Sequence, residues 1–341
     1  MRYTVHPLES SDLDAAASLV ADRHTKNRFR LPDLSPSFSD PAHCRAALIT
    51  ALEDSRSTSA AAIADGRLAG FAIGATSVSQ SDSLLGQIGA ARSATVNAHT
   101  MGLAEGEAAT SVFRSIYRDL SGGWIANGFF DHNVHVIAGD REIEAAWFNL
   151  GFGKTTSVAL RPTASADWPK TDVSVLTAGE EDVDVVIGLQ RALGHHHMDA
   201  PMFLHWPLLG DADSAAREFL IPLLQDPGSP HFIAYRDGRA LGMTSFMSRG
   251  LTPPVINQEK NVYLFMGIVE PESQADGVGG ALLDHGLAWA REQGYERCTL
   301  HVLTANYSGA PFWFGHGFVS HEEALARHID ERLVWARPDR P

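Results

Sequence analysis

The chain has 341 residues, of which 44% are hydrophobic and 20% are charged. This composition is typical of a globular protein, and the length suggests about two domains. The net charge of −14 disfavours nucleic acid as a partner and favours a cationic one, because phosphates are bound by basic surface. Two cysteines give no disulfide framework and no zinc spacing. We expect no signal peptide, no membrane span, a cytoplasmic location and a monomer or homodimer.

The N-terminal half reads as alternating strands and helices. The order begins with a strand at residues 3–8, a helix from Ser10 to Val20 and a second helix at residues 45–52. Two short strands then flank Asp65-Gly66, a dipeptide typical of a tight β-hairpin. A central strand, a long helix, a further strand and a short helix are expected before the closing strand.

The C-terminal half repeats this order. It has a strand at residues 173–176, helices at 180–193 and 214–224, and a second hairpin at Asp237-Gly238. His301, Trp313 and Gly317 each stand 166 positions after His135, Trp147 and Gly151, whereas the hairpins are offset by 172. This self-similarity predicts a duplicated domain.

The predicted boundaries follow from the repeat. Residues 1–161 form the first domain, residues 162–171 a linker rich in Pro, Ser, Ala and Thr, and residues 172–341 the second domain. The last strand is expected at residues 332–337.

The stretch from Val262 to Phe318 carries the most specific signal. An apolar run at residues 262–269 predicts a buried strand, and a glycine-containing segment at residues 274–280 separates it from an apolar-periodic helix that ends at Gly294. Glycines allow a ligand to approach the main chain, and the N–H groups of a first helical turn attract an anion. The segment is therefore a candidate diphosphate site.

Three known diphosphate loops can be compared with this segment. A P-loop requires Lys and Ser or Thr where Ala281 and Leu282 stand, and a dinucleotide-binding turn requires a third glycine at Leu282. The pattern Q/R-x-x-G-x-G/A fits without a gap. With Asn306, Phe312-Trp313 and Gly317-Phe318 downstream, the stretch resembles the GCN5-related N-acetyltransferase (GNAT) superfamily, and the repeat resembles its tandem-domain members.

The resemblance implies a fold and a cofactor. The fold is α/β (α+β), with two tandem GNAT domains, each a mixed, mostly antiparallel twisted sheet flanked by helices. Acetyl-CoA is the implied cofactor, and no metal is expected. The residues implied to bind it are Ile268, Val269, Gln274, Ala275, Asp276, Gly277, Val278, Gly279, Gly280 and Asn306. A strand bulge near Ile268 and Val269 is expected to offer a main-chain N–H to the thioester carbonyl.

The N-terminal copy serves as an internal control for the loop. The offset of 166 places Ala108 at Gln274, Ser111 at Gly277 and Phe113 at Gly279. We expect Phe113 to block the diphosphate position, so that the first copy is degenerate and one acetyl-CoA binds per chain.

The catalytic side chains are less clear from the sequence. The family's usual tyrosine falls at Trp313, and its usual Glu or His falls near Tyr263 and Phe265, so no carboxylate base is visible. Tyr263 and Trp313 are the candidates, and packing is an alternative role for Trp313. His301 has a twin in His135, which favours a core histidine over a catalytic one.

The segment after the first helix of the second copy is the candidate acceptor pocket. Its candidate substrate-binding residues are His197, Asp199, Phe203 and Trp206. Consecutive histidines on a helix do not converge on one ion, so a metal is disfavoured. The resulting hypothesis is N-acetyl transfer, without a covalent enzyme intermediate, to the primary amine of a small cationic molecule such as an antibiotic, an amino sugar or a polyamine. Acetylation of a protein or peptide and a non-catalytic acetyl-CoA sensor are the alternatives.

Overall fold

The computed structural model describes residues 3–79, 89–165, 171–205, 212–248 and 251–335. They build two lobes joined by one sheet of 12 strands, in the order β1-β2-β3-β4-β5-β12-β6-β11-β10-β9-β8-β7. Most neighbouring strands are antiparallel, and the exceptions are the parallel pairs β4–β5 and β10–β11. The predicted fold of mixed, mostly antiparallel sheet flanked by helices is confirmed.

Each lobe follows the element order that the repeat predicts. The N-terminal half contains β1 (Thr4–His6), α1 (Leu13–Arg28), α2 (Pro41–Glu53), β2 (Ser57–Ala64), β3 (Arg67–Val78), β4 (Arg92–Leu103), α4 (Ala109–Ala126), β5 (Asp131–Ile137), α5 (Arg141–Phe148) and β6 (Gly153–Pro162). The C-terminal half contains β7 (Ser174–Thr177), α6 (Val183–Met198), α7 (Ala212–Leu224), β8 (His231–Arg236), β9 (Arg239–Met247), β10 (Asn261–Val269), α8 (Val278–Glu292), β11 (Arg297–Leu303), α9 (Gly309–Gly315), β12 (Val319–His328) and α10 (Arg332–Trp335). Residues 332–335 are therefore helical, and the strand predicted to begin at Arg332 is wrong.

The two hairpins have the backbone that their sequences demand. Asp65 and Gly66 have φ of 48° and 73°, and Asp237 and Gly238 have φ of 51° and 79°. Two successive residues with positive φ give the turn whose twist matches that of the flanking strands. The hairpins thus fix the register of β2 with β3 and of β8 with β9.

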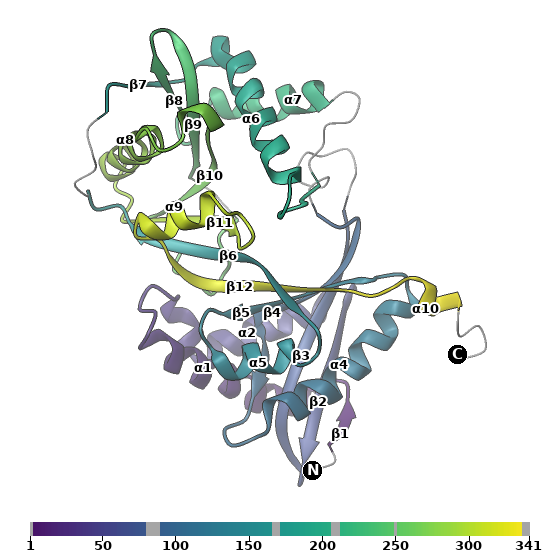
Figure 1. Ribbon diagram of the computed structural model, residues 1–341. Coiled ribbons are helices and arrows are strands. Elements are labelled where there is room, and N and C mark those ends of the chain that lie inside the picture. Colours follow the sequence, from purple (N-terminus) through teal and green to yellow (C-terminus); the bar gives the residue numbers. More distant parts are fainter. Residues whose placement is uncertain (1–2, 80–88, 166–170, 206–211, 249–250, 336–341) are drawn as a thin grey trace.

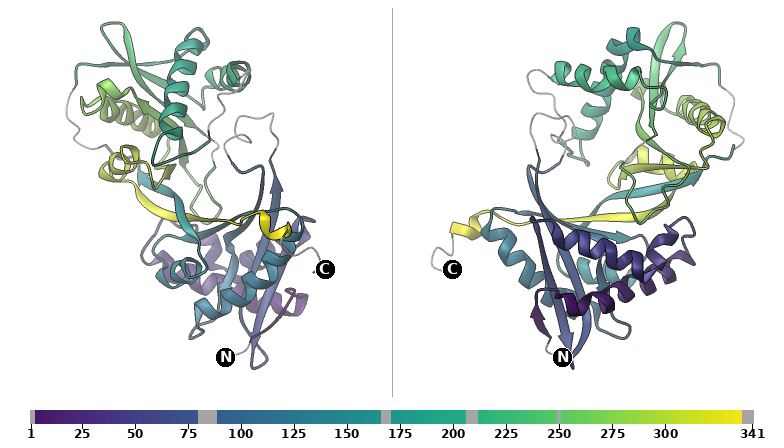
Figure 2. Two further views of the ribbon diagram at one scale, coloured as in Figure 1. Left: turned by 45° about the vertical axis from the view of Figure 1, so that its right-hand side comes forward. Right: turned by 180° about the vertical axis from the view of Figure 1, so that it is seen from behind.

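The closing strands of the two halves are exchanged. β6, from the N-terminal half, pairs with β11 of the C-terminal half, and β12, from the C-terminal half, pairs with β5 of the N-terminal half. β6 and β12 also pair with each other, and both run between the lobes (Figures 1 and 2). Each lobe's sheet is therefore completed by the other half of the chain.

Helices cover both faces of the sheet and bury four apolar clusters. In the N-terminal half, α4 and α5 pack on one face, and α1 and α2 on the other. In the C-terminal half, α8 packs on one face, and α6 and α7 on the other. Among the described residues, no helix is long and apolar enough to cross a membrane, and no three His, Cys, Asp or Glu side chains converge as a metal site.

Candidate functional site

The loop between β10 and α8 exposes a row of backbone N–H groups. Ala275 and Gly277 have φ of 69° and 79°, and α8 begins only at Val278. Within the described part of the chain, no hydrogen-bond acceptor faces the N–H groups of residues 275–280. A helix N-terminus with its N–H groups free is suited to an anion, and the helix dipole adds to the attraction.

Short contacts hold this loop in place. The Gln274 side chain donates to the carbonyl of Val269 at 3.2 Å, which ties the loop to the end of β10. Arg236 pairs with the Asp276 carboxylate at 3.4 Å and so offsets a negative charge beside the anion position. Gly279 has no room for a side chain, because an added Cβ would lie 3.0 Å from the Phe312 ring. Gly277 adopts the left-handed conformation that glycine accepts without strain.

β10 and β11 diverge and leave an open edge next to the loop. Their parallel pairing ends at Tyr263 opposite Thr299, so β10 has no partner strand on this side from Leu264 to Val269. The bulge against β9 lies between Leu264 and Met266. The prediction of a bulge near Ile268 and Val269 is therefore wrong in position, although both residues do lie on the open edge. An unpaired strand edge can bind an extended ligand through main-chain hydrogen bonds.

Asn306 and Trp313 line the same opening from the α9 side. Asn306 is buried, and its Oδ1 accepts from the N–H of Gly309 at 2.7 Å, which secures the start of α9. Trp313 is half-buried and packs over Gly267 of β10, where an added Cβ would lie 2.9 Å from the indole. In the other half Trp147 is fully buried. Of the two equivalent tryptophans, only Trp313 therefore borders an open strand edge.

The equivalent loop of the N-terminal half has become helix. The segments from Leu103 to Gly128 and from Val269 to Gly294 are equal in length, yet α4 begins at Ala109, one turn earlier in register than α8. Residues 109–111 thus take a helical course where residues 275–277 form the loop, and the N–H groups of Ser111 and Val112 bond to the carbonyl of Ala108.

The expectation that Phe113 blocks an anion is wrong. Phe113 is fully buried, and its ring lies against Trp147 with a centroid distance of 5.2 Å. At this point the two halves differ in the course of the backbone. The side chain of Phe113 packs in the apolar core.

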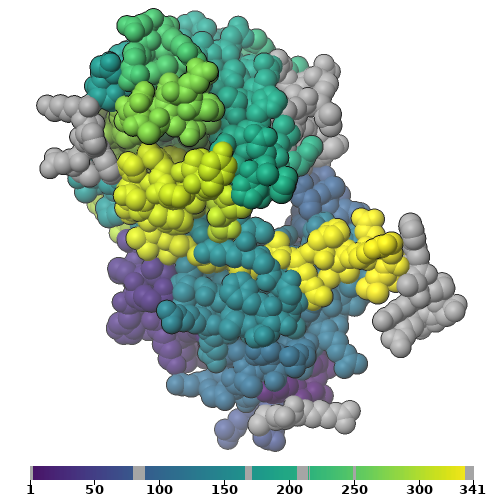
Figure 3. Space-filling view, viewed as in Figure 1, coloured from purple at the N-terminus to yellow at the C-terminus, as the bar shows by residue number. Residues whose placement is uncertain are grey.

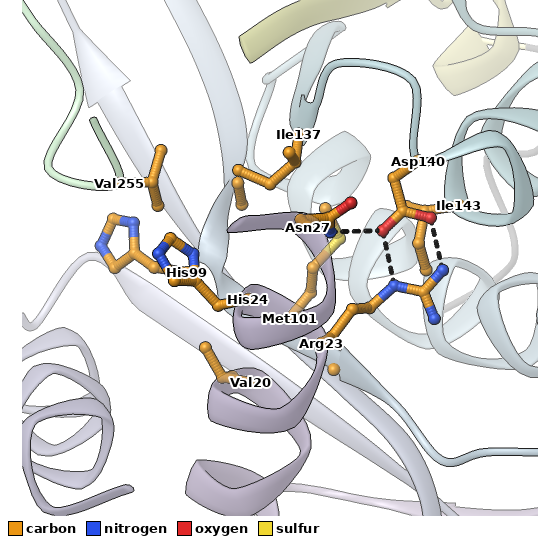
Figure 4. A pocket seen from close by; sticks show the side chains of 12 residues that line it. Val20, Arg23, His24, Asn27, His99, Met101, Ile137, Asp140, Ile143 and Val255 are labelled. Atoms are coloured by element: carbon orange, nitrogen blue, oxygen red, sulfur yellow. Dashed lines mark hydrogen bonds and ion pairs between the residues drawn. The ribbon is translucent and has the colours of Figure 1, made fainter. Parts of the chain in front are cut away.

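Where β4 and β5 diverge in the N-terminal half, charged and polar side chains line a pocket. Asp140, which follows β5, pairs with Arg23 of α1 and accepts from Asn27 at 3.1 Å (Figure 4). Burial acts to raise the pKa of Asp140, but the hydrogen bonds and charge of Arg23 outweigh it and hold the pKa below its usual value. The offset of 166 makes Asp140 the counterpart of Asn306, so an ion pair stands in one half where a neutral amide stands in the other.

Tyr263 and His301 meet where β10 and β11 separate, on the α6 face of the sheet. The Tyr263 hydroxyl lies 2.9 Å from His301 Nδ1, and burial raises the pKa of the phenol above its usual value. Tyr263 is 4% exposed, whereas His301 is exposed. The prediction that His301 is a core histidine is therefore wrong. The sequence feature that could have indicated its exposure is its position near the end of β11, the strand that faces the open edge of β10.

The predicted acceptor segment is only partly brought to this opening. At the end of α6, His196 Nε2 lies 3.3 Å from Asn306 Oδ1 and its ring faces Tyr307. The neighbouring His197 is half-buried, and desolvation lowers its pKa to about 4. Asp199 and Phe203 are exposed, Phe203 by 75%. Trp206 lies outside the described residues.

The surface of the molecule is hollowed between the two lobes. Figure 3 shows an opening between the C-terminal half above and β12 below. Tyr307, which the sequence did not single out, is 64% exposed beside His196. Its position five residues before the aromatic pair Phe312-Trp313 carries no signal by itself, because only the fold of the 304–308 turn places it there.

Comparison with known proteins connects this geometry to one family. Residues 196–318 match the model of the acetyltransferase (GNAT) family. A GCN5-related N-acetyltransferase from Sphaerobacter thermophilus superposes with a TM-score of 0.54 at 13% identity, covering 96% of this chain and 97% of that one.

Two further solved structures are similar. A glucosamine N-acetyltransferase region in a fungal multi-domain β-N-acetylglucosaminidase gives a TM-score of 0.53 at 11% identity, over 95% of this chain and 38% of that one. A tandem GNAT protein from the clavulanic acid biosynthesis pathway gives 0.46 at 13% identity, over 96% and 98%. A search of curated proteins found no match. At these identities the two likenesses with TM-scores above 0.5 establish the fold and nothing about the substrate.

Proposed function

We propose, starting from the GNAT-family domain in residues 196–318, that the chain is an acetyl-CoA-dependent N-acetyltransferase. The acceptor is the primary amine of a small cationic molecule, of the antibiotic, amino-sugar or polyamine kind. The observation that carries the proposal is the row of N–H groups at residues 275–280, without acceptors among the described residues, adjoining the open edge of β10.

The residues present fit a diphosphate followed by an extended arm. The N–H groups of Ala275 to Gly280 bind the diphosphate, and the left-handed backbone of Gly277 leads the chain into the first turn of α8. Ile268 and Val269 offer main-chain groups to the arm, as a neighbouring strand would, and Asn306 borders its path. Gln274 keeps the loop in register with the strand end.

Acetyl-CoA, when bound, supplies an activated acetyl group, and the chain positions it for direct attack by the amine. A main-chain N–H of the open edge polarises the carbonyl, and holding both reactants together can contribute about 7–11 kcal/mol at best. Tyr263 stands at the end of the strand gap where the acetyl group would lie, and we propose that it supports catalysis there. Trp313 packs over Gly267 and forms a wall of the site. We assign it no acid role, because an indole N–H donates a hydrogen bond but does not act as an acid.

We further propose that only residues 172–341 bind cofactor and that residues 1–161 form a degenerate copy, joined by residues 162–171. Two observations support this division. The loop of the N-terminal half is helical at residues 109–111, and the Arg23–Asp140 pair stands in the place of the neutral amide of Asn306.

The test has two parts. Calorimetry with acetyl-CoA and the purified chain should give one site per chain. Release of free thiol should then be followed with panels of aminoglycosides, polyamines and amino acids, with a peptide panel as the comparison. A small amine that accelerates thiol release well beyond hydrolysis is expected, and absence of acetyl-CoA binding would end the proposal.

A non-catalytic acetyl-CoA sensor is the second candidate. It is favoured by the apolar and aromatic character of β10, where no carboxylate stands among residues 261–269. Saturable binding of acetyl-CoA with no thiol release from any amine or peptide would select the sensor. Turnover with peptides alone would select a protein or peptide N-acetyltransferase.

A further inference from the structure

The pair formed by Tyr263 and His301 leaves an imidazole, not a phenol, at the surface. The two rings meet nearly edge to face, with centroids 5.7 Å apart, and the hydroxyl reaches Nδ1 at 2.9 Å. Tyr263 is buried and His301 is exposed. The phenol is therefore held inside, and the free side of the imidazole faces solvent.

The position of the pair follows from the sheet register. Tyr263 opposite Thr299 is the last paired position before β10 and β11 separate. Side chains alternate along a strand, so His301, two residues after Thr299, lies on the same face. That face is the one covered by α6 and α7, opposite to the face covered by α8. His301 thus stands at the closed end of the gap, on the side away from the proposed diphosphate site.

Both groups are neutral at neutral pH. Burial raises the pKa of the Tyr263 hydroxyl, so it stays protonated at neutral pH. The surrounding protein lowers the pKa of His301 to about 4 by desolvation, and the nearby His135 acts in the same direction. A neutral imidazole carries a lone pair, which a base requires.

The twin histidine of the N-terminal half is held differently. His135 is half-buried, and its Nδ1 lies 2.8 Å from Oε1 of the buried Glu322 on the exchanged strand β12. Through β6, Val158 pairs with both His301 and Glu322, which places these two side chains on one face of the sheet. Tyr263 on β10 therefore contacts His301, while His135 on β5 and its partner Glu322 on β12 lie on the same face of the sheet, and of these four only His301 is exposed.

We propose that His301 is the catalytic base of the proposed acetyl transfer and that Tyr263 is its positioning residue. The inference rests on the proposed function. The geometry admits the tautomer in which Nδ1–H donates to the Tyr263 oxygen and Nε2 carries the lone pair toward the opening.

The step balances with these groups alone. The amine nitrogen forms a bond to the thioester carbonyl carbon, and the carbon–sulfur bond breaks with its electron pair on sulfur. Nε2 of His301 takes the proton that the nitrogen loses. The imidazolium then returns this proton to the thiolate, which leaves as free CoA thiol. One neutral histidine therefore acts as the base and then as the acid, in place of the family's usual residues that this chain lacks.

Bromoacetyl-CoA tests this placement without knowledge of the acceptor. An imidazole nitrogen beside the acetyl position displaces bromide, so that a carbon–nitrogen bond forms, the carbon–bromine bond breaks and the ring proton passes to buffer. Peptide mass mapping of the full chain should locate the label on His301, and excess CoA should suppress it. H301Q should lower the labelling rate at least tenfold while the CoA dissociation constant stays within twofold.

Matched variants separate positioning from folding. His285 is exposed on α8, so H285Q is the control. Bromoacetyl-CoA should label His301 in this variant at the same rate as in the unsubstituted chain. Y263F should slow labelling three- to tenfold with an unchanged dissociation constant for CoA, because the ring remains but its hydrogen bond is lost. If H301Q fails to fold, as judged by circular dichroism, H301N takes its place.

The outcomes distinguish the two proposals. Without CoA binding to the unsubstituted chain, the proposed function fails and the inference fails with it. With CoA binding intact, a label on another residue, no label at all, or equal labelling of H301Q overturns the role of His301 and leaves the acetyltransferase proposal standing.

Discussion

The two halves of this chain share a fold and differ at the positions where a cofactor would sit. Both have the same hairpin, the same parallel strand pair and equal spacing from strand end to helix end. In the C-terminal half the loop before α8 is left-handed at two residues and the strand gap is open. In the N-terminal half the loop is a helical turn and the gap holds an ion pair. A fold can therefore persist on its apolar pattern while a few backbone positions decide whether a ligand fits.

The largest effect is expected from removing the strand that the halves exchange. A chain that ends at Phe318 lacks β12, which pairs with both β5 and β6 and buries Leu325 in the N-terminal core. Both lobes should lose cooperative unfolding, as followed by circular dichroism during heating. A chain that ends at Glu331 keeps β12 and should unfold like the full chain. Cooperative unfolding of the shorter chain would show that the lobes are independent.

Removal of Arg23 should destabilise the N-terminal half strongly. R23A leaves the largely buried Asp140 carboxylate without its cation, which should cost about 1–3 kcal/mol. Urea unfolding at pH 7 measures the loss, and the dissociation constant of acetyl-CoA should stay within twofold. The matched change in the other half, H196A, removes long contacts of 3.3 Å to Asn306 and Ser308 and should cost below about 1 kcal/mol.

A bulky side chain in the loop should abolish cofactor binding in the C-terminal half alone. Gly277 has φ of 79°, so G277W places a strained indole beside the free N–H groups. We expect the dissociation constant of acetyl-CoA to rise at least about 100-fold, equivalent to about 2.7 kcal/mol. Calorimetry measures it, with S111W at the corresponding position of the N-terminal half as the control. Equal weakening by both variants would contradict the assignment of one binding copy.

Acid should destabilise both halves through buried histidines. His24 and His231 are 4% and 1% exposed, and desolvation lowers the pKa of each to about 4. The unfolded chain, with an ordinary histidine pKa of about 6.5, binds more protons between these values, so stability is lost as pH falls from about 6.5 to 4. Each histidine should contribute a loss of about 2 kcal/mol between pH 7 and pH 5.

Urea unfolding at the two pH values checks this prediction. H24Q and H231Q should each reduce the pH dependence by that amount, one in each half. A pH dependence that neither substitution changes would assign the acid sensitivity to other groups.

Local patterns in the sequence were sufficient for much of the fold. Apolar periodicity, Asp-Gly turns and helix-ending glycines act over a few residues, so they fixed the element order and the internal repeat. The glycine pattern at residues 274–280 was likewise enough to indicate the loop, since the need for positive φ and close approach is local.

Tertiary structure alone decided which strands pair and which side chains face the opening. β6 and β12 occupy equivalent places in the repeat, so either could close either lobe with similar hydrogen bonds, and their exchange leaves no mark in the local pattern. Arg23 meets Asp140 across 117 residues, and His301 is exposed although its twin His135 is bound to Glu322. Such pairings depend on how distant elements pack, and periodicity within one element carries no information about them.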